Sequence, residues 1–190
     1  MNDSISSPAT AAGNGRARYD NIAITLHWLT AGFVVAQFAL SQVWGFFERP
    51  TRHVLLVTHM SFGVLLTVVI VARIAWRLVP GHQVRPANSG WMEIASKTAH
   101  YSLYVLLASE AVLGFLLGWS GKSGTMSFFG LSIPSPLMPF SGDSHHLIGE
   151  MHEWVGWTII ILATGHAMAA LFHHYVLRDG LLSRMAPGQG

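Results

Sequence analysis

The sequence predicts an all-α protein, a bundle of four transmembrane helices, and three observations support this prediction. Of the 190 residues, 51% are hydrophobic and only 11% are charged, whereas a soluble domain usually has about 25% charged residues. Four apolar runs are each about as long as the roughly 20 residues that a spanning helix needs. None has the short length and alternating polarity of a barrel strand. The composition therefore favours a membrane protein over one with a large soluble core.

The apolar runs also give the approximate bounds of the helices. The runs contain no Asp, Lys or Arg, and Glu110 is their one acidic residue. With their flanking residues they predict helices at about 22–47, 53–79, 94–119 and 145–175. These helices form one transmembrane domain, residues 19–180.

The connecting segments are polar or interrupted by glycine and proline. Residues 1–18 have almost nothing to bury, which predicts a disordered tail. Residues 48–52 are expected to form a tight polar turn around Pro50. Residues 120–144 are rich in Gly, Ser and Pro and are long enough to fold back as a cap. Residues 181–190 are expected to be a C-terminal tail.

The composition excludes several classes of function. The chain has no cysteine, so disulfides, iron–sulfur clusters and thiolate catalysis are excluded. A formal charge of +2 and a pI near 9.3 are too mild to indicate nucleic-acid binding. No glycine-rich phosphate loop follows a strand, which argues against a nicotinamide or flavin site. Eleven histidines, as many as Lys and Arg together, are the unusual feature.

The basic residues predict the orientation of the helices, because cytoplasmic loops carry an excess of Lys and Arg. Three lie on one side of the predicted membrane: Arg49, Arg52 and Lys122. Eight lie on the side of the two termini and the middle loop: Arg16, Arg18, Arg73, Arg77, Arg85, Lys97, Arg178 and Arg184. Both termini are therefore expected in the cytoplasm.

With this orientation, four histidines fall at two depths. His152 and His166 are 14 residues apart in one helix (166 − 152), so they leave nearly the same face, roughly 21 Å apart along the axis. His152 and His59 are expected near the outer surface, and His166 and His27 near the inner one. Height alone then pairs His27 with His166 and His59 with His152.

Two neutral imidazoles that face each other across a bundle can bind a haem iron axially, and bundle cores commonly hold cofactors. Arg73 follows His59 by 14 residues (73 − 59), which makes it a candidate partner for an inner haem propionate. Gly32, Gly63 and Gly156 follow histidines closely and would leave room for a porphyrin.

Other interpretations of these residues remain open. A single intramembrane histidine is often a core residue bonded to a backbone carbonyl, and glycines are ordinary in membrane helix packing. A histidine-lined metal transporter without haem is a further alternative, although carboxylate or sulfur ligands would be expected along its path.

Several short motifs resemble the bacterial cytochrome b561 family, in particular its four-helix di-haem superoxide oxidase type. The resemblance covers about residues 19–187. The matching elements are ITLHWL at 24–29, HMSFG at 59–63, RIAWR at 73–77, HE at 152–153, HHY at 173–175, RD at 178–179 and RMAP at 184–187.

The resemblance implies two b haems with His27, His59, His152 and His166 as axial ligands to iron. It implies a multi-pass protein of the bacterial inner membrane, in contact with lipid, that exchanges electrons with ubiquinone. Members of the superoxide oxidase type oxidise superoxide at the outer face and reduce ubiquinone. Related cytochromes are instead electron-carrier subunits of a membrane hydrogenase or dehydrogenase, and this alternative stays open.

Further polar residues are candidates for substrate sites. His173, His174 and Arg178, at the inner end of the fourth helix, are candidate quinone ligands, or they anchor the helix end to lipid phosphate. Arg49 and Arg52 are candidates for steering superoxide, a small anion.

Two polar residues within the third helix have open roles. Glu110 is costly in mid-membrane when ionised; it is either protonated and bonded to a neighbouring helix or part of a proton path. His100 is expected to open the third helix, either bonding a propionate or serving as a polar helix terminus.

Overall fold

The computed structural model describes residues 19–80, 90–137, 140–180 and 182–185, and four long helices dominate it. The predicted N-terminal tail lies outside the described residues, as does most of the predicted C-terminal tail. The helices are α1 (Asn21–Val43), α2 (Arg49–Leu78), α3 (Trp91–Trp119) and α4 (Gly142–Phe172). The shorter elements are strands β1 (Thr125–Phe128) and β2 (Leu131–Pro134), a π-helical turn (His173–Leu177), and 3₁₀ turns at Trp44–Phe46 and Leu182–Met185.

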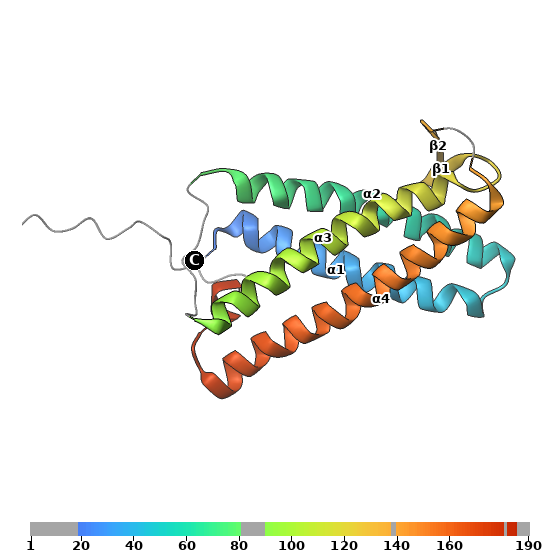
Figure 1. Ribbon diagram of the computed structural model, residues 1–190. Helices are drawn as coiled ribbons and strands as arrows, with labels where there is room; N and C mark the ends of the chain where they lie inside the picture. The colour runs from blue at the N-terminus through green and yellow to red at the C-terminus, as the bar shows by residue number, and fades with distance from the viewer. Residues whose placement is uncertain (1–18, 81–89, 138–139, 181, 186–190) are drawn as a thin grey trace, which may run out of the picture.

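The four helices run side by side along the length of the molecule (Figure 1). α1 packs mainly on α2 and α3 mainly on α4, and α2 also contacts α3. We call the end that carries β1 and β2 the hairpin end, and the end where α1 begins and α4 finishes the terminal end. All four helices are long and apolar enough to cross a membrane. The predicted all-α bundle of four transmembrane helices is confirmed.

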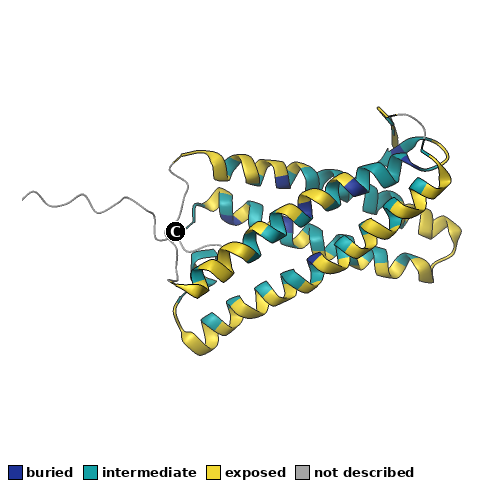
Figure 2. Ribbon diagram, viewed as in Figure 1, coloured by how far each residue is buried: buried dark blue, intermediate teal, exposed yellow. Residues whose placement is uncertain are grey.

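Exposed residues run along all four helices (Figure 2), and many of them are large apolar residues, as contact with lipid requires. Those exposed on the four helices include Val35, Val68, Val105 and Ile161. The buried core is a small apolar layer formed by Ile70, Leu107 and Ile159. Ile159 stands seven residues after His152 and seven before His166, so this layer lies midway between the two predicted histidine levels.

Capping residues set the starts of α1 and α4. The Asp20 carboxylate accepts a hydrogen bond from the Ala23 N–H at 2.9 Å, and the Ser141 hydroxyl caps α4 in the same way. α2 departs from the sequence prediction, because residues 49–52 are its first turn and not part of a polar turn. Pro50 is tolerated there, since the first N–H groups of a helix have no intrahelical partner.

The segment after α3 forms a β-hairpin that the sequence analysis does not predict. β1 and β2 pair antiparallel, with Phe128 opposite Leu131. The two turn residues, Phe129 and Gly130, have φ angles of 44° and 89°, the positive values that a tight type I′ turn requires. Phe129 adopts a positive φ although it is not a glycine, and its N–H donates a hydrogen bond to the Ser61 hydroxyl oxygen at 2.8 Å. The hairpin is thereby fixed to α2.

Ser61 is expected to hold this hairpin in place. Its side chain is fully buried and also donates to the Val57 carbonyl at 2.7 Å. Ser61→Ala leaves the Phe129 N–H without its acceptor, which is expected to lower the free energy of unfolding by about 1–2 kcal/mol. Thermal unfolding in detergent and limited proteolysis of the hairpin measure this loss. Ser132→Ala, at an exposed hairpin position, is the control, and equal effects of the two changes would contradict the prediction.

Candidate functional site

Two histidines face each other across the bundle at the hairpin end. His59 comes from α2 and His152 from α4, and their ring centroids are 6.3 Å apart with the ring planes nearly perpendicular. The sequence analysis pairs these two residues by depth, and the fold brings them together. His59 also lies against the Trp44 ring, with the centroids 5.1 Å apart.

The Nδ1 atom of each ring has an oxygen beside it. Nδ1 of His59 lies 3.2 Å from the backbone carbonyl oxygen of Gln37. Nδ1 of His152 lies 3.2 Å from Oε1 of Glu110. An imidazole whose Nδ1–H faces an oxygen has the lone pair of Nε2 available for a metal, the arrangement usual for metal-ligating histidine.

Both histidines line a cavity of about 780 Å³, a volume typical of sites for small molecules and cofactors. All four helices and β1 contribute to its wall, so Met126 of the hairpin closes one side. Three polar atoms in this wall, Oε1 of Gln37, Oε2 of Glu110 and Nδ1 of His152, are buried without a hydrogen-bond partner among the described residues.

Glycines allow side chains to approach closely within this cavity. A Cβ atom at Gly114 would lie 3.4 Å from Cε1 of His152, so α3 passes directly beside this ring. A Cβ atom at Gly63 would lie 3.1 Å from Nε2 of Gln37, and one at Gly156 would lie 3.1 Å from Oε1 of Glu110. A Cβ atom at Gly32 would meet nothing within 4 Å. Gly114, which the sequence analysis omits, is thus the glycine closest to a histidine ring.

The hairpin-end cavity fits a haem on three observations. It offers two imidazoles from opposite helices, a cofactor-sized volume, and glycine surfaces beside the rings. Imidazole nitrogen is a common axial ligand of haem iron.

The terminal end gathers three histidines rather than the predicted two. His27 comes from α1 and His166 from α4, and His100 of α3 lies beside His166, with the ring centroids 5.0 Å apart. His100 does not open α3 as expected, because the helix begins at Trp91 and His100 lies more than two turns inside it. Two imidazoles and a nearby cation for a propionate are the donor set that a second haem needs.

Arg73 lies at this end but contacts a histidine. Its guanidinium donates to Nδ1 of His27 at 3.0 Å and also faces the Tyr104 ring. A neutral imidazole that accepts at Nδ1 carries its proton on Nε2. This contact and axial ligation through Nε2 of His27 therefore exclude each other, and the guanidinium must leave the ring for a haem to bind there.

The candidate quinone ligands lie where α4 ends. His173 is paired with Asp179, whereas His174 and Arg178 are exposed. Arg178 ends the π-helical turn. It has a φ of 52°, the left-handed conformation that often closes helices, and its backbone N–H donates to the His173 carbonyl oxygen.

The candidate steering residues lie at the hairpin end. Arg49 is exposed in the first turn of α2. Arg52 donates to the carbonyl oxygens of Trp44 and Gly45, at 3.4 and 3.3 Å. It is therefore fixed to the turn that places Trp44 against His59.

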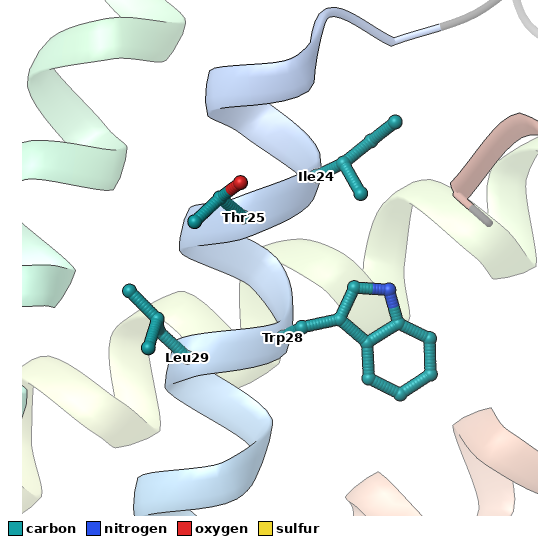
Figure 3. A pocket seen from close by; sticks show the side chains of 4 residues that line it. All are labelled: Ile24, Thr25, Trp28 and Leu29. Atoms are coloured by element: carbon teal, nitrogen blue, oxygen red, sulfur yellow. The ribbon is translucent and has the colours of Figure 1, made fainter. Parts of the chain in front are cut away.

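A smaller hollow of about 310 Å³ lies on α1 and is lined by Ile24, Thr25, Trp28 and Leu29 (Figure 3). The Trp28 indole N–H donates to the Met185 carbonyl at 2.9 Å, which ties the last described turn to α1. Because one helix supplies all four lining residues, this hollow has no second wall and is not a candidate site.

The site includes residues that the sequence analysis did not assign to the histidines, namely Gln37, Trp44 and Glu110. The contact of Gln37 uses a backbone carbonyl, which no side-chain motif reveals. Glu110 did leave a signal, because it is the one acidic residue in the four apolar runs and a carboxyl group in mid-membrane needs a partner.

Comparison with known proteins agrees with this arrangement. Residues 18–188 match the family model of prokaryotic cytochrome b561. Cytochrome b561 homolog 1 of Escherichia coli K12 is 32% identical over 179 residues, covering 90% of this chain and 97% of the relative. Cytochrome b561 homolog 2 of the same organism is 30% identical over 181 residues, covering 90% and 93%. A protein of Yersinia pestis named probable superoxide oxidase CybB is 26% identical over 171 residues, covering 90% and 96%.

The match spans nearly the whole chain, the four helices are long and apolar enough to cross a membrane, and the family implies binding of haem b. The chain therefore belongs to the prokaryotic cytochrome b561 family, as a bacterial membrane electron carrier.

Proposed function

We propose that this protein binds two b haems and transfers electrons from superoxide at the outer membrane face to ubiquinone. The residues that would hold the haem irons are His59 and His152 at the outer level and His27 and His166 at the inner level. The observation that carries the proposal is the facing of His59 and His152 across a cofactor-sized cavity. Bound haem supplies one-electron redox chemistry, while the protein sets its position, ligation and potential.

The residues around the histidines have distinct tasks in this proposal. The Gln37 carbonyl orients the His59 ring through Nδ1. Arg73 releases His27 when the inner level is occupied, and an anionic propionate is the group that its guanidinium would then pair with. The apolar layer of Ile70, Leu107 and Ile159 separates the two levels and offers no polar partner to water.

We assign the hairpin end to the outer face, because eight of the eleven basic residues fall on the other side. Both termini are then cytoplasmic. Arg52 supports a superoxide site at the outer end, because a cation fixed to the turn that carries Trp44 attracts a small anion toward the outer level. The name of the Yersinia pestis relative supports the same substrate.

We place the quinone at the cytoplasmic end of α4. His174 and Arg178 are exposed there and can donate to a quinone carbonyl. His173 is held by Asp179, so it is the more rigid member of this group.

Rapid mixing of the oxidised, purified protein with superoxide tests this function. Superoxide is expected to reduce the haems, as seen in their absorption bands. A ubiquinone analogue is expected to reoxidise the haems and to allow repeated turnover. Superoxide dismutase added beforehand removes the signal and is the control. Bands that superoxide leaves oxidised, but that a membrane dehydrogenase reduces, would contradict the proposal and favour an electron-carrier subunit.

A further inference from the structure

Glu110 contacts a proposed metal ligand from a neighbouring helix, and the family assignment gives it no role. Its Oε1 atom lies 3.2 Å from Nδ1 of His152, and the two side chains are 20% and 22% exposed. The contact joins α3 to α4 inside the cavity at the hairpin end.

The fold makes room for this carboxyl group on α4. A Cβ atom at Gly156 would lie 3.1 Å from Oε1 of Glu110, closer than side chains usually pack. Gly156 stands one helical turn after His152, so the absence of a side chain there opens a notch below the ring. The carboxyl group occupies this notch, which places it against Nδ1.

A carboxyl group inside a membrane bundle is costly unless it has a specific partner. Glu110 is the one acidic residue in the four apolar runs. The His152 ring is the polar group beside it, with Nδ1 at 3.2 Å from Oε1, although the present orientation of the two groups makes no hydrogen bond.

We infer that Glu110 is a positioning residue, which accepts the Nδ1–H of His152, turns its Nε2 toward His59 and increases electron donation to a metal bound there. This inference rests on the proposed ligand role of His152. Carboxylates on the second nitrogen of a ligating histidine fix its ring and raise its basicity. His59 has a backbone carbonyl in the same place, so the two outer ligands are unequal donors.

The midpoint potential of the outer haem tests this inference, with the potential of the inner haem as an internal reference. A ligand that donates less favours the ferrous state. Glu110→Leu is therefore expected to raise the ferrous-to-ferric ratio of the outer haem about tenfold at a fixed potential, about 59 mV for one electron. The amide oxygen in Glu110→Gln accepts more weakly than a carboxylate, so this variant is expected to show a smaller rise in the ferrous-to-ferric ratio. If the leucine variant loses haem, the glutamine variant is measured in its place.

Two controls separate this role from a general change in polarity. Gln37→Leu removes a polar side chain from the same cavity but leaves the backbone carbonyl beside His59, and is expected to shift the potential much less. Gly156→Ala pushes the carboxyl group out of its notch. It is expected to shift the potential in the same direction in the natural protein, and to add nothing in the Glu110→Leu background.

Substitutions of the Glu110 side chain leave its backbone in place. An unchanged potential in Glu110→Leu would show that the carboxyl group does not act on His152 and would overturn the inference. Equal shifts in Glu110→Leu and Gln37→Leu would overturn it as well. The proposed ligation fails separately, if His152→Ala leaves the spectrum and both potentials unchanged.

Discussion

Replacing His152 with alanine is expected to remove the outer haem and to leave the inner one bound. His152 supplies one of the two imidazoles that face each other in the hairpin-end cavity, and alanine cannot ligate iron. The purified variant is expected to hold one haem per chain in place of two, as measured by the haem content and the absorption of the reduced bands. Superoxide is then expected to reduce the remaining haem far more slowly, because its proposed entry level is lost.

His146→Ala is the matched control, because this histidine lies on the same helix but its side chain is 76% exposed. It is expected to retain both haems. Loss of both haems from a folded His152→Ala variant, with its helix content preserved, would contradict the pairing by depth. Retention of both would contradict the assignment of His152.

Replacing His166 with alanine is expected to remove the inner haem, whereas His100→Ala is expected to retain it. The two rings are in contact at the terminal end, so proximity alone does not distinguish them. The distinction comes from α4, where His166 shares a face with His152 and lies at the level of His27. Haem content, measured with the absorption of each reduced band, compares the two variants.

The opposite result, with haem lost in His100→Ala and kept in His166→Ala, would make His100 the inner ligand. It would contradict the prediction that α4 supplies one histidine at each level. An alanine variant of either residue that unfolds is replaced by glutamine, which fills similar space without an imidazole.

The sequence predicted the four helices well because each carries its own signal. About 20 apolar residues without charge are enough to indicate a spanning helix, and this signal does not depend on neighbouring helices. The main difference is the start of α2, since the sequence predicts a turn around Pro50 although proline also fits the first turn of a helix. The hairpin was missed because its turn, Phe129-Gly130, has only one residue that favours positive φ.

The residues alone were enough to predict the fold class and the family, and they placed four histidines at two expected depths, because helical spacing converts residue numbers into depth and face. It did not determine which groups surround each ring. The contact of Glu110 with His152, the notch at Gly156 and the place of His100 beside His166 all join different helices. These contacts follow only from the packed bundle, since the rotation of one helix against another depends on packing between side chains that are far apart in the chain.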